Sequence, residues 1–149
     1  MDLNLPGYDV RVRESENGDK EIFDSFRRKY VKLTPEEWVR QHFLHFLSDE
    51  KEYPATLISV EKQLIILGRS KRFDAVVFKN DGTPSVLIEF KAPSVKLNQN
   101  VVEQVASYNF ALHANFLIVS NGLSHYCCKM DYENRTYNLM SEIPFFKEL

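Results

Sequence analysis

The sequence lacks the features that mark membrane, secreted and motor proteins. Its 149 residues contain no apolar run close to the roughly 20 residues that a membrane-spanning helix needs. The first residues, MDLNLPGYDV, have neither the basic nor the apolar region of a secretory signal peptide. The phosphate-binding loop of ATP-driven motors, Gly-x-x-x-x-Gly-Lys-Ser/Thr, is also missing. We therefore expect a soluble, cytoplasmic protein with no membrane partner and no ATPase motor within this chain.

The sequence also has only two cysteines and a small net charge. Cys127 and Cys128 are adjacent, and neighbouring cysteines rarely form a disulfide or a metal site, so we expect two buried thiols. The 19 basic and 21 acidic residues give a net charge of −2, unlike a strongly basic nucleic-acid-binding domain. Any contact with nucleic acid must come from local patches, although such runs are more often plain solvated surface. Two patches are present, RRKYVK (Arg27, Arg28, Lys29, Lys32) and GRSKR (Arg69, Lys71, Arg72).

The chain reads as one domain over residues 1–149, because no repeat, low-complexity tract or linker divides it. Residues 1–20 contain an Asn-Gly pair and predict an arm or an exposed hairpin. The segment LTPEEWVRQHFLHFL predicts a helix, with Thr34 as N-cap and Pro35 at the first helical position. Its apolar residues, among them Val39, Phe43 and Leu47, fall along one face.

The middle of the chain alternates between strand and helix patterns. The runs TLISVEKQLIIL, RFDAVVFKN and SVLIEFK are rich in β-branched and aromatic residues and predict an antiparallel meander. NQNVVEQVASYNFALHA predicts a helix, and the apolar strand NFLIVSNG that follows it should pair parallel to its neighbour. We expect an α/β (α+β) fold with an αβββαβ core over residues 21–120, in which a mixed sheet lies between helices. Residues 121–149 predict a hairpin, from SHYCCKM and TYNLM, and a tail.

Three charged residues stand out on the predicted hairpin RFDAVVFKNDGTPSVLIEFK. Side chains alternate along a strand, so Glu89 and Lys91 share a face. A hairpin that turns at NDGT brings Asp74, near the start of one strand, beside the end of the next, and hence close to Glu89. Two neighbouring carboxylates repel each other, and either Lys91 or a divalent cation such as Mg²⁺ relieves that repulsion.

The Glu-x-Lys triplet carries little information alone, since about one is expected by chance in this composition. Its position is more informative, because it ends a strand and is followed by a helix. On that helix Gln104 and Tyr108 are four residues apart and therefore project from one face. Without the rest of the pattern, Gln104 and Tyr108 could equally belong to an ordinary half-buried helix face.

The combination of Asp74, Glu89-Phe90-Lys91 and Gln104-Val-Ala-Ser-Tyr108 resembles the PD-(D/E)XK nuclease superfamily. Together with LTPEEWVRQHFLHFL and VEKQL, it is most similar to the N-terminal nuclease region of type I restriction-enzyme R subunits, over roughly residues 21 to 120. The resemblance implies a restriction-endonuclease-like fold and Mg²⁺-dependent cleavage of DNA. Two departures are that Phe73 replaces the proline of the superfamily motif, and that the chain lacks the translocase motif of R subunits.

The resemblance also implies roles for individual residues. Asp74 and Glu89, with the backbone carbonyl of Phe90, would hold Mg²⁺, for which Mn²⁺ could substitute. Lys91 would orient or deprotonate the attacking water, and Gln104 and Tyr108 would flank the site.

An acid from the first helix often completes such sites. Wheel geometry favours Glu36 over Glu37 for this role, and Glu61 on the first strand is a weaker candidate. The residues that we expect to contact DNA phosphates are Arg69, Lys71, Arg72 and Lys96.

Three functions follow from these patterns. The leading hypothesis is a Mg²⁺-dependent deoxyribonuclease that acts with DNA and with a separate motor or specificity subunit. The alternatives are a nuclease-fold module that binds DNA or a partner without turnover, and a small α/β protein in which Asp74, Glu89 and Lys91 form a structural ion pair. A homodimer would supply two sites for two strands. Phe145 and Phe146 in the tail could form its contact, but packing on their own domain is favoured.

Overall fold

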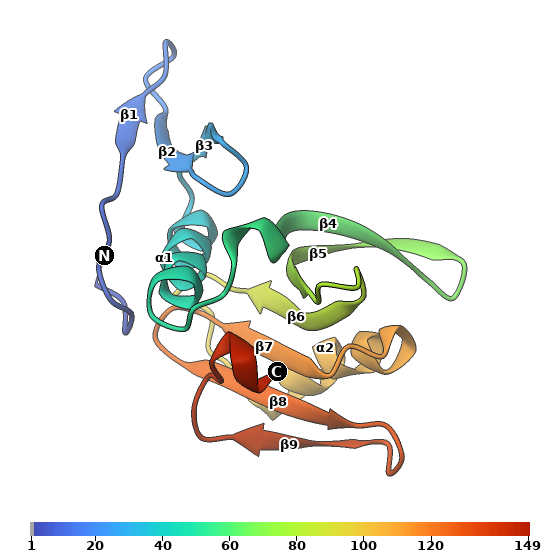
Figure 1. Ribbon diagram of the computed structural model, residues 1–149. Coiled ribbons are helices and arrows are strands. Elements are labelled where there is room, and N and C mark those ends of the chain that lie inside the picture. Colours follow the sequence, from blue (N-terminus) through green and yellow to red (C-terminus); the bar gives the residue numbers. More distant parts are fainter. Residues whose placement is uncertain (1) are drawn as a thin grey trace.

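A large mixed sheet and a small antiparallel sheet make up the computed structural model, which describes residues 2–149 (Figure 1). The small sheet contains β1 (Val12–Glu14), β2 (Lys20–Asp24) and β3 (Lys29–Lys32). The large sheet contains, in spatial order, β4 (Ile58–Ile66), β5 (Arg69–Phe78), β6 (Pro84–Phe90), β7 (Phe116–Ser120), β8 (His125–Asp131) and β9 (Thr136–Met140). The helices are α1 (Pro35–Asp49) and α2 (Gln99–Leu112), with short 3-10 turns at Ala55–Leu57 and Phe146–Glu148.

The large sheet confirms the predicted strand order. β4, β5 and β6 form an antiparallel meander, and β6 pairs parallel with β7 because α2 carries the chain back between them. β8 and β9 extend the sheet as an antiparallel hairpin beyond β7. The mixed sheet flanked by helices is the αβββαβ arrangement expected from the sequence.

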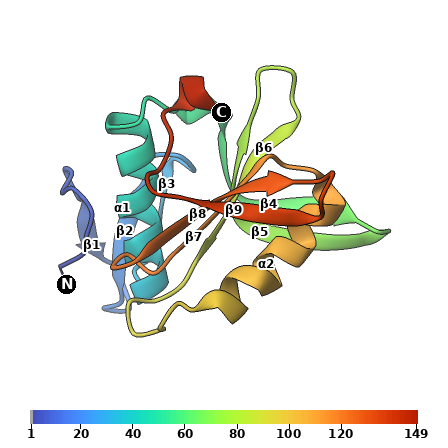
Figure 2. The ribbon, with the colours of Figure 1, turned by 90° about the horizontal axis from the view of Figure 1, so that it is seen from below.

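The two helices pack on opposite faces of this sheet (Figure 2). α1 begins where predicted, since the Thr34 hydroxyl accepts a hydrogen bond of 3.0 Å from the Glu37 amide and Pro35 follows it. Its side chains Phe43 and Leu47 are fully buried against residues such as Ile88. α2 packs on the other face, against a second set of buried strand residues that includes Leu87 and Leu117.

The small sheet goes beyond the sequence prediction. A hairpin around Gly18 joins β1 to β2, as the Asn-Gly pair indicated, but β3 adds a third strand directly before α1. The segment between β2 and β3 runs beside α1, and its side chains reach the site described below. The basic run RRKYVK is therefore divided between this segment and β3.

The C-terminal tail packs on its own domain. Phe146 contacts Tyr53, with ring centroids 5.7 Å apart, and the Tyr53 hydroxyl donates a hydrogen bond of 2.9 Å to the Pro144 carbonyl. Cys127 and Cys128 are free, buried thiols, as predicted. Neither helix within residues 2–149 combines the length and the hydrophobicity needed to span a bilayer.

Candidate functional site

Asp74 and Glu89 lie next to each other across β5 and β6. The register places Ala75 opposite Ile88, so that the next positions along the two strands are Asp74 and Glu89. The Asp74 carboxylate accepts a hydrogen bond of 2.7 Å from the Phe90 amide, which ties it to the end of β6. The hairpin thus brings together the two carboxylates that sequence reasoning paired.

The electrostatics of Glu89 reflect this crowding. Burial is the largest of the effects that together raise the pKa of Glu89 to about 7; the nearby charge of Asp74 and a hydrogen bond with Asp74 add to it, and the charges of Lys71 and Lys91 oppose it. At neutral pH the Glu89 carboxyl is therefore close to half protonated. A bound cation would favour release of that proton, because it stabilises the ionised carboxylate.

Two lysines, Lys71 and Lys91, place positive charge near enough to Glu89 to lower its pKa. Lys91 follows β6 directly, and its backbone amide donates to the Ser120 carbonyl at 2.9 Å, which prolongs the pairing with β7. Lys71 extends from β5, and its ammonium lies 4.8 Å from the centroid of the Tyr108 ring. Sequence reasoning assigned Lys71 to a DNA-contacting patch. The structure also places its charge close enough to Glu89 to lower the pKa of that carboxyl.

The remaining predicted residues are exposed on α2, on β5 and on the loop before α2. Tyr108 contacts Lys71, and Gln104 is exposed one turn earlier on α2. Arg69, Arg72 and Lys96 are exposed, the first two on β5 and Lys96 on the loop between β6 and α2. Arg72 lines an open groove together with Arg27 and Glu61.

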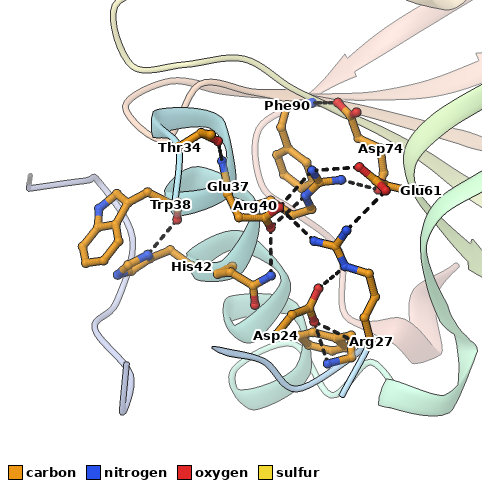
Figure 3. A network of polar contacts seen from close by, with 12 residues as sticks. Asp24, Arg27, Thr34, Glu37, Trp38, Arg40, His42, Glu61, Asp74 and Phe90 are labelled. Carbon is orange, nitrogen blue, oxygen red and sulfur yellow. Dashed lines mark hydrogen bonds and ion pairs between the residues drawn. The ribbon is translucent and has the colours of Figure 1, made fainter. Parts of the chain in front are cut away.

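The expected orientation of Glu36 is wrong. Glu36 is exposed, whereas Glu37 is 5% exposed and accepts hydrogen bonds from Arg40 and Gln41 (Figure 3). The helical-wheel prediction took into account only the side of α1 that faces the sheet. The other side is covered by Arg27, whose guanidinium donates to a Glu37 carboxylate oxygen at 2.8 Å.

The prediction that Arg27 belongs to an exposed basic patch is also wrong. Its side chain is only 16% exposed and forms ion pairs with Asp24, Glu37 and Glu61. Burial opposes ionisation of Asp24, but its hydrogen bonds with Arg27 and the charge of Arg27 outweigh burial and lower its pKa. The neighbouring residues Arg28, Lys29 and Lys32 are exposed, as expected of surface charges.

Arg40 connects this ionic network to the carboxylate pair. It binds Glu37 at 3.1 Å and lies 3.6 Å from Glu61, and its guanidinium also donates to the backbone carbonyl of Asp74 at 3.2 Å. Figure 3 shows Arg40 between α1 and the strand that carries Asp74. Arg40, which sequence reasoning missed, holds the backbone of a candidate metal ligand.

Comparison with known protein families identifies the chain. Residues 35–144 match the family described as the type I restriction enzyme R protein N terminus. The chain belongs to this family. Its restriction-type nuclease-like fold follows from that membership and from the sheet described above. The comparison with curated proteins found no match.

Two solved structures resemble this type I R N-terminal domain. One is a fragment assigned to an HsdR subunit of a type I restriction enzyme from Vibrio vulnificus, with 21% identity and a TM-score of 0.52. The likeness covers 77% of this chain but only 25% of that one, so the present chain spans about a quarter of the HsdR fragment. The other is an Anabaena variabilis protein assigned as a nuclease of the DUF820 group, with 13% identity, a TM-score of 0.52 and coverage of 92% and 88%. At these identities, the likeness shows a shared fold.

The donor set of the R N-terminal domain suits a hard cation with retained water. Within residues 2–149, no three His, Cys, Asp and Glu side chains gather closely enough to hold a metal by themselves. Mg²⁺ commonly uses only one or two carboxylates, with water and substrate phosphate completing its shell. The oxygens of Glu37 already accept from Arg27, Arg40 and Gln41, which leaves Asp74 and Glu89 as the carboxylates that fit this role.

Proposed function

We propose that this domain cleaves DNA phosphodiester bonds with Mg²⁺ as cofactor. The observation that carries the proposal is the placement of Asp74 and Glu89 side by side, where Glu89 is buried enough for its pKa to reach about 7. A carboxyl group kept partly protonated in this way is costly to ionise without a cation. Strongly shifted carboxyl pKa values beside a second carboxylate are typical of functional sites.

In this proposal, Asp74, Glu89 and the Phe90 carbonyl would hold the metal. Bound Mg²⁺ would supply positive charge against the negative charge that develops on the phosphate under attack. The Lys91 ammonium, next in the chain after Phe90, would orient the attacking water and stabilise the same charge. Lys71, held over the ring of Tyr108, would add a second positive charge on the side of α2.

DNA would reach this centre along the exposed basic residues of β5 and of the loop before α2. Arg69, Arg72 and Lys96 would neutralise phosphates on either side of the scissile bond, and binding would weaken as salt increases. Because the chain has no phosphate-binding loop, we propose that a separate motor or specificity subunit delivers DNA to it. A pair of domains would be needed to cut both strands.

Plasmid cleavage in Mg²⁺ or Mn²⁺ tests the proposal. Wild type should convert supercoiled plasmid, whereas Asp74→Ala and Lys91→Ala should lose about a hundredfold or more in rate, as expected when charge-stabilising groups are removed. Lys129→Ala is the matched control, because Lys129 is an exposed lysine of β8 and should retain the wild-type rate. Cleavage that survives both Asp74→Ala and Lys91→Ala would belong to another site or to a contaminant.

The alternative is a domain that binds DNA or another subunit without turnover. The net charge of −2 and the missing motor motif favour this alternative. Calorimetric titration with Mn²⁺ separates the two functions. A nuclease should bind Mn²⁺ in a manner that Glu89→Ala abolishes, whereas a module without a metal site should give no Mn²⁺ signal for either protein.

A further inference from the structure

The outer half of the β4–β5 hairpin is a projecting basic element that we call the hairpin arm (residues 62–72). It extends beyond the neighbouring strands of the sheet (Figure 1). Its sequence, KQLIILGRSKR, contains four basic residues and no acidic residue, although the whole chain has a net charge of −2. A local excess of positive charge of this size indicates a polyanionic partner.

The two faces of the hairpin arm have different environments. Leu64, Ile66 and Phe73 pack toward α2 and the second core cluster. Ile65 and Leu67 point away from that core and are 69% and 90% exposed. Apolar side chains left in water at the tip of a projecting hairpin contribute little to folding, and an exposed apolar patch within charged surroundings marks a contact site.

The backbone conformation at the tip of the hairpin arm disfavours a leucine at position 67. Leu67 and Gly68 have φ angles of 50° and 78°, so both lie in the left-handed region that a tight two-residue hairpin turn requires. Asn-Gly is the preferred pair for such a turn, and leucine is strained there by its Cβ. Leu67 is therefore unfavourable both for its backbone conformation and for its exposure. A residue that violates local preference without a packing benefit points to a function.

The hairpin arm is continuous with the candidate site. Asp74 follows the arm on β5, and the arm residue Lys71 lies over Tyr108 and acts on the charge of Glu89. On the other side, Lys62 and Arg72 line an open groove of about 570 Å³, together with Arg27. A phosphate held through Mg²⁺ at Asp74 and Glu89 would thus place the flanking DNA against the arm and its apolar tip.

We propose that the hairpin arm binds duplex DNA beside the scissile bond and inserts Leu67, supported by Ile65, between base pairs. This inference rests on the proposed action on DNA and extends it to a substrate class. Inserting an apolar side chain requires neighbouring bases to unstack, which is easier where stacking is already interrupted. The domain therefore prefers nicked or bulged duplexes to intact ones, and the basic residues of the arm supply affinity for any duplex.

Fluorescence anisotropy with labelled duplexes of one sequence tests this preference. The duplexes are intact, nicked or bulged, and EDTA is present so that no strand is cut. Wild type should bind the nicked and bulged duplexes about tenfold or more tightly than the intact one, because less stacking has to be broken. Leu67→Asn should reduce this ratio to about twofold or less. Its thermal stability should be unchanged or higher, since asparagine suits the left-handed turn.

Two further variants complete the design. Leu139→Asn replaces another exposed leucine, 63% exposed on β9 at the opposite edge of the sheet, and should keep the wild-type ratio. Arg72→Gln should weaken binding to all duplexes by a similar factor and reduce the slope of log affinity against log salt by about one. A specific loss of nick preference in Leu67→Asn alone would support insertion of the tip.

Several outcomes would overturn the proposal. It is refuted if wild type shows no preference for interrupted duplexes, if wild type binds no duplex, or if Leu67→Asn keeps the full wild-type preference. Loss of association with another subunit in Leu67→Asn, with nick preference intact, would make the tip a protein contact instead. The plasmid-cleavage assay tests the nuclease proposal separately, and cleavage that does not depend on Asp74 would refute it. Plasmid cleavage that depends on Asp74 can persist when insertion is refuted.

Discussion

Replacing Glu89 with glutamine should stabilise the metal-free protein at alkaline pH while abolishing metal binding. Burial and the neighbouring Asp74 charge raise the pKa of Glu89 from 4.5 to about 7, so that ionised Glu89 is unfavourable in the folded state. Glutamine has nearly the same shape and can form hydrogen bonds, but it carries no charge. The variant thus separates the cost of the charge from the packing of the side chain.

The sign and size of the effect follow from proton linkage. Between pH 4.5 and about 7, folded Glu89 keeps a proton that the unfolded chain has lost, so this group lowers the free energy of unfolding as pH rises through that window. At about 1.4 kcal/mol for each pKa unit, the shift from 4.5 to about 7 corresponds to roughly 3.5 kcal/mol at most. Glu89→Gln should match wild type near pH 4 and exceed it by up to this amount near pH 8.

Urea unfolding in EDTA at a series of pH values measures the difference. Glu133→Gln is the matched control, because Glu133 is exposed in the turn between β8 and β9. Mn²⁺ should stabilise wild type at pH 8 but leave Glu89→Gln unchanged. A stability difference between Glu89→Gln and wild type that does not vary between pH 4 and pH 8 would refute the argument that burial and Asp74 disfavour the Glu89 charge.

Two further substitutions probe the framework. Arg27→Met should lower the free energy of unfolding by about 3 kcal/mol, because it leaves Asp24 and Glu37 buried without a shared cation. The control Arg28→Met, at an exposed neighbour, should change the free energy of unfolding little. Equal losses in the two variants would show that the ion pairs of Arg27 do not stabilise the fold. Phe43→Ala should lower the free energy of unfolding, measured with urea, by about 3–5 kcal/mol, because Phe43 is fully buried against Phe90. A loss below about 1 kcal/mol would mean that neighbouring side chains move in to fill the cavity.

The fold could be predicted because its signals are local. The cap at Thr34 and the Pro35 that follows it define the start of α1, and the apolar strand of β7 after α2 requires a crossover and thus parallel pairing with β6. The small sheet was only partly visible. Its first hairpin has an Asn-Gly turn, but β3 has just four residues and no buried face, so no periodic pattern marks it.

The candidate site was predictable in part, because strand alternation holds on β6 but fails on β5. Phe73 and Val76, three residues apart, pack in the same core cluster, although regular alternation would place them on opposite faces. Between them lies an irregularity in the described strands, where the ladder pairs Val60 with Ala75 and Lys62 with Phe73 but omits Glu61 and Asp74. Glu61 has a φ of 54° there. Such a distortion redirects side chains, and no local residue preference announces it.

The same irregularity separates carboxylates of two kinds. Glu61 reaches Arg27 and Arg40, which also hold Glu37, so these acids already have cationic partners. Glu89 instead stands beside another carboxylate and keeps its proton up to about pH 7. A divalent cation gains least from acids that arginine already neutralises and most from those that repel each other. Whether an acid already has a cationic partner, more than the number of acids, therefore decides where a metal would bind. Arg27, which precedes the matched residues 35–144, is one of the cations that neutralise Glu37.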